Sequence, residues 1–136
     1  MLKLTTRITG DKELIAKFQR LEKALQGQTL VRAATAGILP IQNEAIVKVA
    51  KDTGTLSRSI HTETLEARNN YAEVTTGTDV VYAARIEFGF MQADSLGRHY
   101  NQPAQPYMRP AFDNKKSVAE NETRAALTDL IQAAAK

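Results

Sequence analysis

The chain has 136 residues, of which 43% are hydrophobic and 24% charged, and this suits a single domain that builds its own core. It contains no cysteine, no tryptophan and only two histidines, so we exclude disulfides, thiolate metal sites and cysteine nucleophiles, and we expect no cofactor. The net charge of +3 is uneven, because residues 1–60 carry ten basic and five acidic side chains, and residues 61–136 carry eight and ten. This split is compatible with head-to-tail packing of copies, although solvated faces alone also explain it.

The sequence offers no sign of a membrane protein. No apolar run approaches the roughly 20 residues of a membrane span, and the first residues lack the long apolar core of a signal peptide. We therefore expect a soluble, intracellular protein without membrane contact. The net charge is too small to indicate nucleic-acid binding by itself.

The first two elements are predicted to be a strand and an amphipathic helix. Residues 2–9 alternate between two sets of side chains, with Leu2, Leu4 and Ile8 in one set, which is the period of a half-buried strand. From Asp11 the period becomes helical, and one apolar stripe is formed by Leu14, Phe18, Leu21 and Leu25.

A second helix is predicted from about Thr29 to Lys51, with apolar side chains on two nearly opposite sides. The two lines consist of Val31, Ala34, Ile38, Ile41, Ala45 and Val49, and of Leu39, Ile46 and Ala50. Either one side faces the core and the other a neighbouring copy, or the helix is buried at the centre of the domain. Because Gly37 and Pro40 lie inside it, we expect a kink near residue 37 or two helices in place of one.

Residues 60–78 are rich in threonine and are predicted to form a β-hairpin with strands Ile60–Arg68 and Tyr71–Thr78. Asn69-Asn70 suits a two-residue turn, because asparagine tolerates positive φ. Direct pairing places Leu65 opposite Val74, but it also places Glu66 opposite Glu73, which is unfavourable. Either Arg68 relieves that acidic pair or the loop is longer than two residues.

The rest of the chain is predicted to be a short helix over Tyr82–Phe88, a long flexible loop at about 89–105, and a C-terminal helix from about 110. A loop of this length is uncommon in a compact domain and is usually functional or disordered. The prediction is one α+β domain over residues 1–136. An antiparallel sheet, made of the N-terminal strand and the central hairpin, packs against two N-terminal helices and the long C-terminal helix.

The strongest candidate for chemistry is Asp52-Thr53-Gly54, because aspartic proteases place a carboxylate in such a turn. A protease needs apolar strands around the turn, whereas here a helical pattern precedes it and the largely polar segment 55–59 follows. His61 and His99 have no further ligand nearby at metal-binding spacing. We therefore expect a protein that is not an enzyme and that has no catalytic, cofactor-binding or metal-binding residues.

Three stretches, in the same order along the chain, together resemble one protein family. Residues 52–60 are similar to its Thr-Gly-x-Leu-x-x-Ser-Ile signature at Thr53, Gly54, Leu56, Ser59 and Ile60. Residues 82–89 resemble its Tyr-Ala-x-x-x-Glu-Phe-Gly segment at Tyr82, Glu87, Phe88 and Gly89. Residues 105–112 resemble the Pro-aromatic-x-Arg-Pro-Ala start of its last helix at Pro106, Arg109 and Pro110.

These motifs resemble those of the neck or tail-completion proteins (head–tail joining, minor tail components) of long-tailed double-stranded DNA bacteriophages and prophages. The resemblance covers about residues 11–113. Lys51 and Phe90 stand where that family often has proline and threonine.

The resemblance implies a structural virion protein of the head–tail junction that assembles with copies of itself into a ring, after synthesis in the host cytoplasm. Its other partners would be head-completion and tail proteins, and DNA would pass without sequence-specific binding. For most motif residues packing is the expected role, and Glu87 can pair with Arg109. The candidate assembly interface consists of Leu39, Ile46, Phe90, Met91, His99 and Tyr100. The alternative is a small basic nucleic-acid-binding protein that uses the positively charged half.

Overall fold

The structure is a computed structural model that describes residues 5, 7, 9–52 and 54–136. Its elements, in chain order, are α1 (Asp11–Ala24), α2 (Gly27–Lys48), α3 (Thr55–Ser59), β1 (His61–Arg68), β2 (Tyr71–Gly77), α4 (Ala83–Phe88), β3 (Phe90–Ala93), β4 (His99–Gln102) and α5 (Met108–Ala135). The predicted strand over residues 2–9 lies mostly outside the described residues, and so does Thr53.

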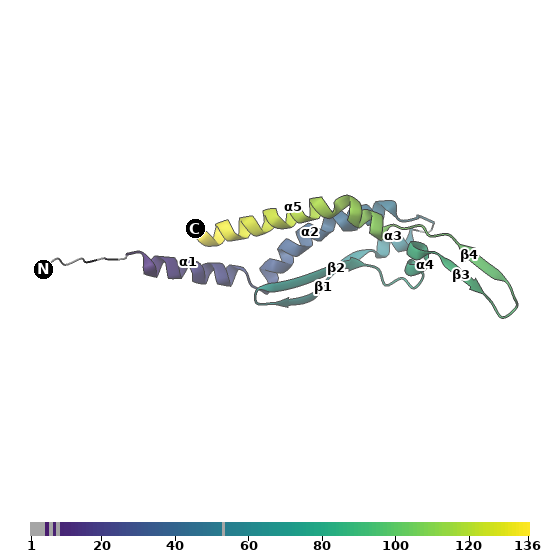
Figure 1. The fold of residues 1–136 in the computed structure, drawn as a ribbon, viewed down its shortest axis with the longest axis horizontal. Helices are drawn as coiled ribbons and strands as arrows, with labels where there is room; N and C mark the ends of the chain where they lie inside the picture. Colours follow the sequence, from purple (N-terminus) through teal and green to yellow (C-terminus); the bar gives the residue numbers. More distant parts are fainter. Residues whose placement is uncertain (1–4, 6, 8, 53) are drawn as a thin grey trace.

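The molecule is an elongated three-layer arrangement of helices and a two-stranded sheet. Helix α2 packs against α5 on one side and against the β1–β2 hairpin on the other (Figure 1). Helix α1 and the β3–β4 hairpin lie at opposite ends of the long axis (Figure 1). The prediction of a mixed α+β fold, with an antiparallel sheet packed on helices, is confirmed.

Helix α2 is the central element and runs unbroken through Pro40. The second of the two interpretations therefore holds, since α5 and the hairpin of the same chain cover two of its sides. Gly37 marks the closest approach of α5, because a Cβ added there would lie 1.8 Å from Thr123 Oγ1 and 3.0 Å from the Ala119 carbonyl oxygen. This glycine serves helix packing, and the prediction of two helices is wrong.

The β1–β2 hairpin has the predicted two-residue turn, with Asn70 at a φ of 61°. Glu66 stands opposite Glu73, and Arg68 Nε lies 3.1 Å from the Glu66 carboxylate, so Arg68 relieves the acidic pair. The predicted pairing of Leu65 with Val74 is wrong. The register shifts between Thr64 and Glu66, Thr64 pairs with Val74, and Leu65 is left on an irregularity with 56% of its surface exposed.

The segment predicted to be a long loop forms a second hairpin, β3–β4. Phe90 pairs with Gln102 and Ala93 with His99, around a turn in which Gly97 has a φ of 77°. The Asp94 carboxylate closes the turn by accepting hydrogen bonds from the backbone N–H of Leu96 (3.0 Å) and of Arg98 (2.9 Å). Strands of four residues, mostly exposed, carry too little apolar alternation to be recognised in a sequence.

The hydrophobic core is small and lies where the three motif stretches meet. Its members come from α2 to α5 and include Ile41, Ala45, Val49, Leu56, Ile60, Ala83, Tyr107 and Ala111. None of the residues of α1 is buried, so that helix contributes nothing to this core.

Candidate functional site

The first motif stretch turns the chain from α2 into the hairpin. Gly54 precedes α3 with a φ of 76°, a backbone conformation that favours glycine. The short helix then buries Leu56 and leads to Ile60, which are 3% and 4% exposed. Both side chains join the core, so this part of the motif acts by shaping the fold.

Ser59 fastens the end of α3 to the end of β2. Its hydroxyl donates to the Leu56 carbonyl at 2.7 Å, and its Oγ lies 2.5 Å from Thr78 Oγ1. Thr78 in turn accepts the backbone N–H of Val80 at 3.2 Å. The serine of the motif therefore holds the junction between the hairpin and the segment that leads to α4.

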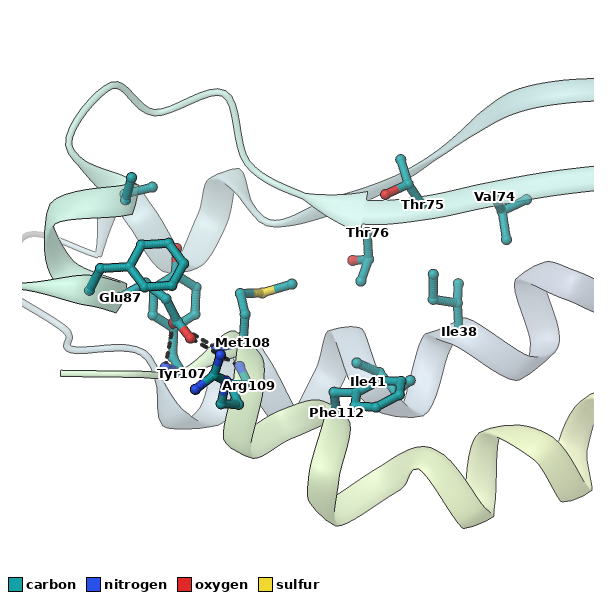
Figure 2. A pocket seen from close by; sticks show the side chains of 13 residues that line it. Ile38, Ile41, Val74, Thr75, Thr76, Glu87, Tyr107, Met108, Arg109 and Phe112 are labelled. Atoms are coloured by element: carbon teal, nitrogen blue, oxygen red, sulfur yellow. Dashed lines mark hydrogen bonds between the residues drawn. The ribbon is translucent and has the colours of Figure 1, made fainter. Parts of the chain in front are cut away.

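Glu87, at the end of α4, holds the N-terminus of α5. Its carboxylate accepts the backbone N–H groups of Tyr107 (2.7 Å), Met108 (2.9 Å) and Arg109 (3.1 Å), and it is only 8% exposed (Figure 2). The first N–H groups of a helix have no partner within the helix, and the helix dipole favours negative charge there. The second and third motif stretches are thus joined through one buried carboxylate. The expected pairing with Arg109 uses that residue's backbone N–H.

The environment of Glu87 favours its charged form. Burial is the largest single influence and acts to raise its pKa, but the three N–H donors and the nearby Arg109 charge outweigh it. The pKa of this carboxyl is therefore below its ordinary value, and Glu87 stays ionised at neutral pH.

Gly89 lets the chain return close to α4. It has a φ of 78°, and an added Cβ would lie 2.9 Å from the backbone nitrogen of Ala104. The Gln105 N–H donates to the Ile86 carbonyl at 2.7 Å beside it. The root of the β3–β4 hairpin is therefore anchored on the last turn of α4.

An apolar groove of about 630 Å³ lies between β2, α2, α4 and the start of α5. Val74 and Thr76 of β2 form one side, and the side chains facing them include Ile38, Ile41, Met108 and Phe112 (Figure 2). Phe88 and Phe112 also line the groove, and they are 73% and 52% exposed. Motif reasoning missed this groove. Its only sequence signal is the pair Phe88 and Phe112 flanking the second and third motif stretches.

Four of the six candidate interface residues gather on the β3–β4 hairpin, on two faces. Directly paired residues share a face of a sheet, so Phe90 lies with Tyr100 (opposite Gln92), and Met91 lies with His99 (opposite Ala93). Met91 is 81% exposed, whereas Phe90 is partly covered by the Arg85 guanidinium, 4.5 Å from its ring centroid.

The other two candidate interface residues lie on α2, away from that hairpin in the sequence. Leu39 is 40% exposed, and Ile46 is partly buried against the core. The structure therefore does not bring all six residues into one patch.

The candidates for chemistry lie apart from one another. Asp52 is exposed at the bend that follows α2, His61 begins β1 with Nδ1 2.8 Å from the Ser59 carbonyl oxygen, and His99 begins β4. Nowhere in the described part of the chain do three His, Asp or Glu side chains gather as a metal site requires. Within the same residues, no helix has the length and apolar character of a membrane span.

The chain exposes far more surface than a compact protein of its mass. Its accessible area is 10211 Å² for 15.0 kDa, whereas a compact monomer of that mass exposes about 7,000 Å². Even when the ten residues before α1 are discounted at the maximum area of an extended chain, about 8,600 Å² stands against an expected area of about 6,700 Å². The remaining excess is about 1,900 Å².

Fold and surface together define a small α+β protein with a modest core and exposed apolar side chains at both ends. The comparison with known families names the class more closely. A family model described as "Bacteriophage HK97-gp10, putative tail-component" matches residues 12–89. The chain therefore belongs to this HK97-gp10-like family of bacteriophage tail components. No curated protein and no solved structure shows significant similarity to it.

Proposed function

We propose that this protein is a structural subunit of the head–tail junction of a bacteriophage particle, where it completes the neck or tail by assembling with copies of itself into a ring. Membership of a phage tail-component family supports a role in the particle. The observation that carries the assembly proposal is the excess accessible area of about 1,900 Å² over a compact monomer. A standard interface covers about 800 Å² on each partner, so the excess matches two interfaces, one for each neighbour in a ring.

The shape of the molecule supports contacts between unlike surfaces. Helix α1 and the β3–β4 hairpin stand at opposite ends, and each exposes large apolar side chains (Figure 1). Contacts between different patches of identical subunits generate closed rings when the rotation closes, and filaments when it does not. A ring is the closed form expected around an axial DNA channel.

The partners in this proposal are further copies of the chain, the head-completion proteins on one side and the tail proteins on the other. DNA passes along the axis without sequence-specific contacts. The uneven charge supports this arrangement, because the basic residues 1–60 and the acidic residues 61–136 offer complementary surfaces.

The proposed action is mechanical, and no catalytic step is part of it. Glu87 is the buried acid that a search for catalysis would choose, and both of its carboxylate oxygens accept backbone N–H groups. Its pKa lies below the ordinary value, whereas a general acid needs a raised one. The chemistry at this position therefore supports a role in holding α5 in place.

Immunogold labelling of purified particles tests the location. The antibody is raised against the described domain, and particles of the same phage with the gene deleted serve as the control. We expect label at the junction between head and tail. Label along the tail shaft or at the distal tip, or particles free of the protein, would overturn the assignment to the junction.

The competing function, a small nucleic-acid-binding protein, predicts a different measurement. Binding to duplex DNA would weaken steeply with salt, with a slope set by the number of phosphate contacts. We expect no measurable duplex binding at physiological salt. Tight, salt-sensitive binding by the isolated chain would favour the competing function.

A further inference from the structure

Helix α1 presents an apolar face that its own chain does not cover. Leu14, Ile15 and Phe18 are 54%, 55% and 61% exposed, and none of the helix's residues is buried. Residues three and four apart share one face of a helix, so these side chains form a single stripe. A helix of 14 residues is marginally stable in water without a surface to pack on.

The apolar groove between β2, α2, α4 and α5 is a surface suited to such a stripe. Recognition of an amphipathic helix by an apolar groove uses anchors at i, i+3 and i+4, which is the spacing of this stripe. The polar atoms at the groove are already engaged, because Glu87 accepts three backbone N–H groups and the Thr76 hydroxyl donates to the His61 carbonyl. An apolar guest therefore leaves none of these groups without a partner.

We propose that α1 of one copy docks in this apolar groove of a second copy. The inference rests on the self-assembly proposed above and names the surfaces that meet. A stripe on one copy and a groove on the next form a contact between unlike patches, which leaves a stripe and a groove available at the two ends of every pair.

Charge supports the same pairing. Residues 1–26, which contain α1, carry six basic and three acidic side chains. Residues 61–88, which contain β1, β2 and α4, carry two basic and five acidic side chains. The segment that bears the stripe and the segment that borders the groove therefore attract each other, which favours the correct end-to-end encounter.

The groove of the same chain is out of reach for α1 in its observed place. Arg20 of α1 donates to the backbone oxygen of Lys136 at 2.9 Å, so α1 lies beside the last residues of the chain. Phe112, in the groove, is 24 residues before Lys136, which corresponds to about 36 Å along the axis of α5. The occupant of the groove is consequently another copy.

Disulfide trapping tests the contact, and the chain contains no cysteine that would give a background. One tagged preparation carries Phe18→Cys, and a second preparation with a different tag carries Phe112→Cys. The control replaces the second chain with Val118→Cys, since Val118 is on the same helix and 41% exposed but does not line the groove. After mixing and mild oxidation, we expect at least tenfold more mixed dimer with Phe112→Cys than with Val118→Cys. Equal yields, or no mixed dimer, would overturn the proposal.

Two further variants separate this contact from its rivals. Phe18→Asp should abolish assembly while leaving the urea midpoint of the monomer unchanged, and rings that persist in this variant would overturn the docking while the proposed function stands. A chain that carries both Phe18→Cys and Phe112→Cys should not close on itself at high dilution. An internal disulfide formed there would mean that α1 fills its own groove, and this also overturns the proposal. If particles lack the protein at the junction, the proposed function fails independently of these results.

Discussion

Replacing Glu87 by glutamine removes one charge and one acceptor from the N-terminus of α5. At present one carboxylate oxygen accepts from Tyr107 and Met108, and the other accepts from Arg109. An amide can keep the first two bonds with its oxygen, but its NH2 group would then face the Arg109 N–H. An unsatisfied buried donor costs about 1–3 kcal/mol, and the lost charge at the helix end costs up to about 2 kcal/mol more. We expect Glu87→Gln to lower the free energy of unfolding by about 2–4 kcal/mol.

The pH dependence gives the same prediction a second readout. Because the pKa of Glu87 is lowered in the folded state, its stabilisation is fully present above the unfolded pKa of about 4.3 and is lost as the pH falls through the lower, folded value. The difference in stability between the wild type and Glu87→Gln should therefore shrink as the pH falls below about 4.

Urea unfolding followed by circular dichroism measures both effects. The matched control is Glu120→Gln, which removes a carboxylate of the same type from an exposed i,i+4 pair with Arg124 on α5. An exposed pair of this kind contributes under about 1 kcal/mol. If Glu87→Gln is no more destabilising than Glu120→Gln at pH 7, or if its effect is the same at pH 7 and pH 3, the capping role is refuted.

Three further predictions concern particular glycines and the tip of the second hairpin. Gly37→Ala should destabilise the fold by about 1–3 kcal/mol in urea unfolding, because the new methyl collides with Thr123, whereas Gly27→Ala, with open space around it, should be neutral or stabilising. Gly89→Ala should also be destabilising, and a variant as stable as the wild type would contradict the close backbone contact at this position. Asp94→Ala should speed hydrogen exchange of the β3–β4 amides without moving the urea midpoint, and unchanged exchange would contradict its role in closing the turn.

Much of the fold follows from sequence patterns, because helices and hairpins are local. The two apolar lines on α2 and the Asn69-Asn70 turn indicate elements whose partners are near or whose geometry is fixed by a few residues. What a pattern cannot give is the identity of the covering surface. The two lines on α2 fit a neighbour as well as the same chain, and the stripe on α1 reads like any core helix although the chain leaves it exposed.

The site was harder to predict for a similar reason. The partners of Glu87 are backbone N–H groups, which every residue but proline has, so no side-chain pattern announces the cap. Gly37 suggested a break because glycine weakens helices, yet its function is to let α5 approach. The groove is formed by side chains from four elements distant in sequence, and only the folded chain brings them together. The family motifs, in contrast, were recognisable because they fix turns and caps at constant spacing.

Electron microscopy of the concentrated wild-type protein tests the central claim, self-assembly into rings, most directly. We predict closed rings of uniform diameter, which Phe18→Asp abolishes. A field of single particles of monomer size at every concentration would contradict the account.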